Sequence, residues 1–233
     1  MIDLAIYGIL AVAIAAGLYR GFFFSFTRLM VFFLAWLIAL GMYPTLARWA
    51  NENTTWVGTV HYYTEDSYRI DDLELWRARI DDIPAATLLE LENETTLPVP
   101  FDRMFAENVD KKALEHLDLY MLKDYYNYTI AFGIVNMLAF LAVFAIAYVA
   151  LILMFDAVDH VFHFPVVRIW DPIGGAAIGL IYGLFMVGLI ISVLPIGLVI
   201  VPGDFLTNLL EKSKLLSSFQ RYEWVTGVVK GIF

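Results

Sequence analysis

Two histidines three positions apart come closest to a metal-binding pattern. His160 and His163 are flanked by Asp156 and Asp159. On a helix, residues at i and i+3 can share a metal ion, and carboxylates could complete its coordination. However, there is no His-Glu-x-x-His pattern, and the spacing fixes no third ligand. We therefore interpret the pair as interfacial histidines on a short connection and expect no metal or other cofactor.

Two arginines beside apolar segments are the next candidates. Arg20 stands in a short corner with Gly21, and Arg28 follows eight residues later, about 12 Å along a helix. A charge at that depth in a bilayer is costly, so Arg28 must reach toward water or find an acidic partner, and Asp171 is expected on the same side of the membrane. Anchoring of the topology is the favoured role. The alternative is a corner that binds a partner or substrate.

Three glycines share one face of an apolar segment. Gly175, Gly179 and Gly183 are four residues apart, a spacing that lets another helix approach closely. Two sets of small residues in the first apolar segment could face them: Gly8, Val12 and Ala16, or Ala13 and Gly17. Packing within the chain is the favoured role. The alternatives are an oligomer interface and a thin permeation path.

Asn136 is the clearest uncharged polar residue deep in an apolar segment, and we expect it to hydrogen-bond between helices. The apolar segments have no paired acids, histidine chain or arginine ladder of the kind that marks transport pathways. Gly-x-Ser-x-Gly, Walker and dinucleotide motifs are also missing. The chain contains no cysteine, which excludes disulfides and thiolate chemistry. No enzymatic activity is expected.

The amino-acid composition indicates that these residues are positioned by apolar helices in a membrane. The 233 residues are 61% hydrophobic and 17% charged, against about 25% charged in a soluble domain. Such an apolar excess indicates an integral membrane protein, and it argues against disordered and nucleic-acid-binding classes. The lipid bilayer is therefore the first expected partner, and no nucleic acid is expected.

Four apolar segments are long enough to cross a bilayer as helices. They are Ile2–Tyr19, Phe22–Met42, Ile130–Phe155 and Ile173 to about Ile200. Pro44 is expected to end the second segment, and Pro172 to lie in the first turn of the fourth. The sequence thus predicts an all-α membrane protein, with one helix pair in residues 1–42 and another in residues 129–201.

The insertion between these pairs, residues 43–128, carries the net charge. It holds 17 Asp and Glu against 8 Lys and Arg, a net charge of −9, which equals that of the whole chain. Recurring apolar positions predict a small helical subdomain. Within it we expect a short strand at Val57–Tyr63, a helix containing Ile70 to Ile80, and a helix capped by Asp110 that continues into the third apolar segment.

The C-terminal residues 202–233 mix leucines and aromatics with lysine and arginine. Charges interrupt every window long enough to span a bilayer. An amphipathic helix lying on the membrane surface is therefore expected in place of a fifth span.

The chain resembles the colicin V production (CvpA-type) family at two places. One is the opening Ile2-Asp3 pair with Tyr19-Arg20-Gly21-Phe22 and Arg28-Leu29 downstream. The other is Asp171 to Gly183 with its spaced glycines. The order of the four segments and the long second connection also agree with that family.

The resemblance implies a non-enzymatic bacterial inner-membrane protein involved in toxin production or export, or in envelope homeostasis. A second copy of the chain or an envelope or secretion protein is the expected partner, and a small oligomeric transporter or channel is the alternative function. Positive-inside reasoning places Arg20 in the cytoplasm, and residues 43–128 and both termini outside it. Related membrane-anchored proteases imply the same orientation.

Overall fold

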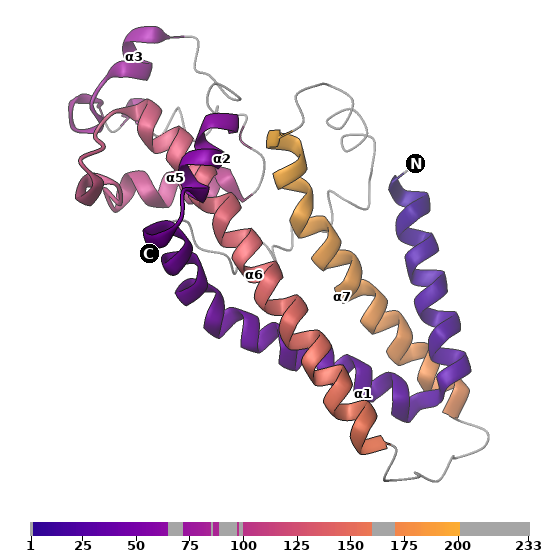
Figure 1. The fold of residues 1–233 in the computed structure, drawn as a ribbon. Coiled ribbons are helices and arrows are strands. Elements are labelled where there is room, and N and C mark those ends of the chain that lie inside the picture. The colour runs from indigo at the N-terminus through magenta and orange to yellow at the C-terminus, as the bar shows by residue number, and fades with distance from the viewer. Residues whose placement is uncertain are drawn as a thin grey trace. The chain divides into compact units, whose positions relative to one another are not determined.

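The computed structural model describes residues 2–64, 72–84, 86–88, 97, 100–159 and 171–200. The described chain is helical and contains no strand; two residues, Arg79 and Met121, form an isolated antiparallel bridge. The α-helices are α1 (Ile2–Asn53), α2 (Trp56–Thr64), α3 (Leu73–Arg77), α5 (Phe101–Asp110), α6 (Leu122–Asp159) and α7 (Asp171–Ile200). Two short 3-10 helices, η1 (Ile80–Asp82) and η2 (Glu115–Leu117), complete the set (Figure 1).

Three of the described helices, α1, α6 and α7, are long and apolar enough to cross a membrane. Helix α1 is divided at Gly21, whose backbone is not helical. We call residues 2–20 the first arm and residues 22–53 the second arm. The 19 residues of the first arm rise about 28 Å, close to the thickness of a bilayer core. The two arms correspond to the first two predicted apolar segments.

The prediction that Pro44 ends the second segment is wrong, because α1 continues through it to Asn53. A proline inside a helix removes one backbone hydrogen bond and typically costs about 3 kcal/mol. Beyond it, Ala47 and Ala50 are buried, so packing holds this part of the helix in place.

Three predictions for residues 43–128 are corrected. The expected strand at Val57–Tyr63 is helix α2, whose first N–H, that of Trp56, bonds to the Thr54 hydroxyl. Helix α3 ends at Arg77, because Ala78 turns to extended backbone and its carbonyl accepts from Leu122 N–H at 3.0 Å. Asp110 ends α5 and caps no helix. At Ala78, a hydrogen bond to a distant part of the chain outweighs the local sequence preference.

The described residues form two compact units. The first contains residues 2–43 and 140–192, and the second contains residues 44–139 and the end of α7 from Val193. In the first unit, Figure 1 shows α7 beside the first arm of α1. Phe32 of the second arm joins an aromatic cluster, with ring centroids 5.2 Å from Phe144 of α6 and 5.8 Å from Tyr182 of α7.

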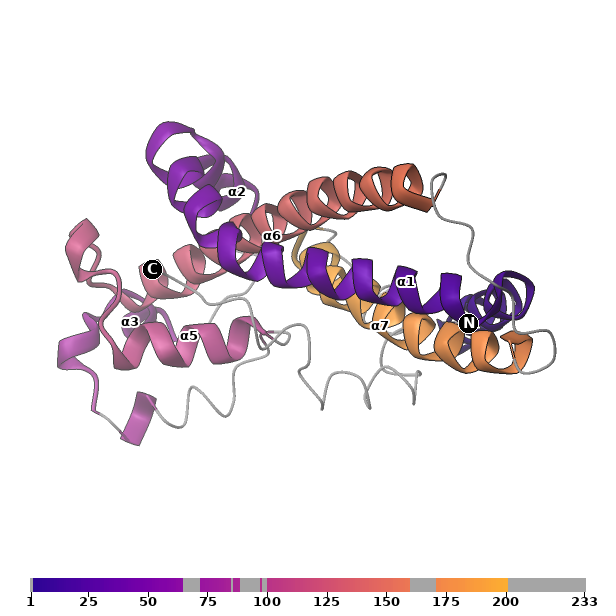
Figure 2. The same ribbon diagram turned by 90° about the horizontal axis from the view of Figure 1, so that it is seen from below.

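In the second unit, α5 packs beside the beginning of α6 (Figure 2). Buried Asn108 donates a hydrogen bond to the Thr129 hydroxyl at 2.8 Å, and Phe105 contacts Tyr126 with ring centroids 5.0 Å apart. Phe101 is fully buried. As predicted, the helix that leaves this unit runs unbroken through the third apolar segment, although it begins at Leu122.

Several predictions lie outside the described residues. These are the surface helix in residues 202–233 and the pair His160 and His163. The side chains of Asp156 and Asp159 also lie outside them.

Candidate functional site

The corner between the two arms of α1 depends on Gly21. Its φ of 82° and ψ of 175° lie in a region that is almost exclusive to glycine. This conformation interrupts the helix and starts the second arm in a new direction. The Arg20–Gly21 pair singled out in the sequence therefore forms the turn itself.

Asp171, the first residue of α7, fastens this corner. Its Oδ1 accepts a hydrogen bond from the backbone N–H of Phe22 at 2.9 Å. The first N–H groups of a helix have no partner within the helix, and an anion there also interacts favourably with the helix dipole. Asp171 thus caps the second arm from a different helix. A Cβ on Gly21 would collide with the same carboxylate.

The predicted glycines bring α7 against the backbone of the first arm. A Cβ on Gly175 would collide with the carbonyl oxygen of Gly17, and one on Gly179 would collide with that of Ala13. Further along, a Cβ on Gly183 would lie 2.8 Å from the Ala13 side chain. Of the two candidate faces of the first arm, α7 therefore packs on Ala13 and Gly17. Gly8 has open space beside it.

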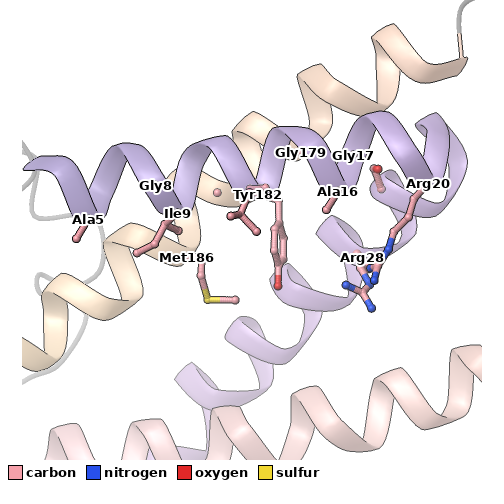
Figure 3. Close-up of a pocket in the computed structure, with 14 residues that line it drawn as sticks. Ala5, Gly8, Ile9, Ala16, Gly17, Arg20, Arg28, Gly179, Tyr182 and Met186 are labelled. Atoms are coloured by element: carbon pink, nitrogen blue, oxygen red, sulfur yellow. The ribbon is translucent and has the colours of Figure 1, made fainter.

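A cavity of about 640 Å³ lies beside this contact, and Ala13, Gly17, Gly179 and Gly183 are among the residues that line it. Arg20 and Arg28 line it together with Tyr182 of α7 (Figure 3). Because the chain turns at Gly21, Arg28 on the second arm faces the same space as Arg20 on the first. The two arginines singled out in the sequence are thus brought together, while Asp171 lies at the corner and bonds to backbone.

A comparison with known protein families matched the part of the chain that forms the corner. Residues 2–69 match the sequence model of a family described as colicin V production protein. This match confirms the predicted resemblance, and it covers both arms and the corner. No curated protein and no solved structure matched the chain.

The match to the colicin V production family ends before α6 and α7, which complete the site. Two tyrosines there were not predicted from the sequence. The hydroxyl oxygens of Tyr148 in α6 and Tyr182 in α7 lie 2.9 Å apart and share a hydrogen bond. A polar group inside an apolar segment is the signal that pointed to Asn136. The same signal could have identified Tyr148 and Tyr182.

Asn136 is buried in the part of α6 that belongs to the second unit, whereas the glycines belong to the first. It therefore lies in a different region from the glycine contacts, and its predicted hydrogen bond between helices stays a prediction. Within the described part of the chain, no group of three or more His, Asp or Glu residues is arranged to hold a metal ion.

Proposed function

We propose that this chain is a multi-pass bacterial inner-membrane protein of the colicin V production type. It would act as a non-enzymatic scaffold or accessory component in toxin production or export, or in envelope homeostasis. The observation that carries the proposal is the family match over residues 2–69. This segment contains the Gly21 corner, where Asp171 caps the second arm.

The contacts of the first unit support a scaffold. Three of its polar side chains form hydrogen bonds between helices: Asp171 caps the second arm, and Tyr148 bonds to Tyr182. The glycine contacts hold α7 and the first arm at backbone distance. A helix pair held this closely presents a constant surface to a partner, which would be a second copy of the chain or an envelope or secretion protein.

A complementation experiment tests the proposal. A bacterium that lacks its own colicin V production protein would receive the wild-type chain, Gly179→Leu or the control Gly197→Leu. Gly197 also lies in α7, and a Cβ there meets nothing within 4 Å. We expect wild type and the control to restore toxin secretion or resistance to envelope stress, and Gly179→Leu to fail. Failure of the wild-type chain, or full rescue by Gly179→Leu, would contradict the proposed role.

The proposed topology has four spans, with the two arms of α1 counted separately. Arg20 would lie in the cytoplasm, and residues 43–128 and both termini outside it. Because the chain has no cysteine, Tyr19→Cys and His116→Cys each supply a single label site, and both side chains are exposed. In intact spheroplasts, a membrane-impermeant thiol reagent should label His116→Cys and spare Tyr19→Cys. The reverse pattern would mean the opposite orientation.

A transporter or channel is the second candidate, and the cavity beside Arg20 and Arg28 is the observation that favours it. Conductance of planar bilayers containing the purified chain tests this alternative without a choice of solute. Conductance that is lost when Gly8→Trp fills the cavity would favour a channel over a scaffold.

A further inference from the structure

The cavity of the first unit is an apolar groove with a cationic end. Its apolar part is lined by small and aliphatic residues of the first arm and by α7: Gly8, Ile9, Val12, Ala16, Tyr182 and Met186. Val12 is 70% exposed, so the groove opens to the surroundings of the helix pair. In a bilayer, these surroundings are acyl chains.

The cationic end is formed by Arg20 and Arg28, whose side chains extend into the same space (Figure 3). None of the described residues that line the cavity carries a carboxylate. Among the described residues, neither guanidinium forms an ion pair. Two like charges that share a space near the membrane repel each other, and an anion between them would remove that repulsion.

Phosphate suits this pair better than other anions of the membrane. The guanidinium fork binds phosphate oxygens through two parallel hydrogen bonds, and arginine is weakly hydrated, so it keeps such contacts near apolar surroundings. The distance along the groove also agrees with a lipid. From Arg20 to Gly8 the first arm rises about 18 Å, close to the length of one acyl chain in a monolayer of about 15 Å.

We propose that the groove binds one anionic phospholipid. Its phosphate lies between Arg20 and Arg28, and one acyl chain lies along the first arm toward Gly8. Apolar side chains alone would accept any lipid, so the arginine pair determines the headgroup. The inference is independent of the scaffold role, because it needs only the first unit in a membrane.

Native mass spectrometry of the full chain tests the headgroup. The protein would be taken from vesicles with equal amounts of phosphatidylglycerol and phosphatidylcholine, and the retained lipids counted. We expect about a tenfold preference for phosphatidylglycerol, given the attraction of two arginines for anionic lipid. Arg20→Gln with Arg28→Gln should abolish it, while Arg77→Gln, an exposed charge of α3, should preserve it. No preference in wild type, or an unchanged preference in the double variant, would overturn the proposal.

A matched glycine pair tests the groove. A Cβ at Gly8 or at Gly41 meets nothing within 4 Å, but only Gly8 lines the cavity. Gly8→Trp should therefore displace the retained phosphatidylglycerol, and Gly41→Trp should not. This pair decides the question even if the arginine double variant does not fold. Retention by Gly8→Trp would overturn the groove assignment.

Excess inorganic phosphate during extraction tests the source of the anion. It should leave the phospholipid bound, because the acyl chain adds contacts that free phosphate lacks. Complete displacement by inorganic phosphate would identify a simple anion site and overturn the assignment to a lipid.

Discussion

Two helix contacts, one inside each unit, are built in opposite ways. In the first unit, α7 and the first arm meet where side chains are missing, at Gly17, Gly175 and Gly179. In the second unit, α5 and α6 meet through large rings and a buried hydrogen bond, as with Phe105 and Tyr126. The part of the chain that supplies the second unit also carries the acidic excess.

The difference between the two contacts follows from their surroundings, which are lipid for the apolar helices and water for the acidic region. Apolar side chains gain little by leaving lipid, so helices in a bilayer associate through close backbone approach and hydrogen bonds. In water, burial of an aromatic side chain is itself strongly favourable. The contact of α7 with the first arm should therefore be sensitive to added atoms, and the contact of α5 with α6 to removed ones.

The largest expected effect is in the second unit. Phe101→Ala should cost about 3–5 kcal/mol, because it removes a fully buried ring and leaves a cavity. Hydrogen exchange measured by mass spectrometry in detergent should show faster exchange in residues 100–139 and little change in residues 2–43. Faster exchange in both regions alike would contradict a separate core.

Gly179→Ala should cost about 2 kcal/mol in the first unit, because its Cβ would meet the carbonyl of Ala13, which is backbone and cannot rotate away. Thermal unfolding followed by circular dichroism measures the loss. The control is Gly197→Ala in the same helix, where the added Cβ meets open space. Equal melting temperatures for the two variants would show that close packing at Gly179 is unimportant.

Gly133→Ala should cost about 1 kcal/mol, less than Gly179→Ala, although both glycines lie in long apolar helices. The added Cβ would lie 2.8 Å from the Phe101 ring and 3.1 Å from the Met104 sulfur, and both side chains can shift. The same unfolding measurement ranks the two variants. A greater loss at Gly133 would reverse the proposed contrast between the units.

Gly41→Ala should stabilise the protein by about 0.5 kcal/mol. The added Cβ meets nothing within 4 Å, and alanine loses less backbone entropy than glycine when it enters a helix. A slightly higher melting temperature is the expected outcome. A clear decrease would indicate that Gly41 is itself a contact point, for example with a second copy of the chain.

The smallest effect concerns the ion pair of Asp81 and Lys112 in the second unit. Lys112 bonds to the carboxylate and lowers the pKa of Asp81 below its ordinary 3.8, while the pKa of Lys112 rises above 10.5. Because the pKa of Asp81 is lower in the folded than in the unfolded protein, its charge stabilises the fold above the unfolded-state pKa, and this stabilisation is lost as the pH falls through the folded-state pKa. Because the pKa of Lys112 is higher in the folded protein, its charge stabilises the fold below the unfolded-state pKa, and this stabilisation is lost as the pH rises through the folded-state pKa.

The pair should therefore contribute between about pH 4 and pH 10, and only weakly, because both groups are exposed. Asp81→Asn should lower the melting temperature slightly at pH 7, and the difference from wild type should disappear in strong acid, once the pH is below the lowered pKa of Asp81. A difference that persists in strong acid would show that the carboxylate charge is not its origin.

The sequence supported the prediction of the long apolar helices, the break at Gly21 and the glycine face of α7. Apolar length and glycine spacing are local properties, and each can be read without knowledge of the neighbours. The helix through Pro44 and the turn after Arg77 were mispredicted. At these positions, burial of Ala47 and Ala50 or hydrogen bonds between Ala78 and Leu122 override the local preference.

Composition alone indicates a helical membrane protein, and the Arg20–Gly21 pair between two apolar segments indicates a corner there. The tertiary structure shows which face of the first arm meets α7. Gly8 and Gly17 are both glycines, but only Gly17 has the backbone of Gly175 against it. It also decided that Asp171 caps the second arm and that Arg20 and Arg28 share a cavity. Asp171 is 149 positions from Phe22, so this contact forms only when the helices pack, whereas Arg20 and Arg28 meet because the chain turns at Gly21.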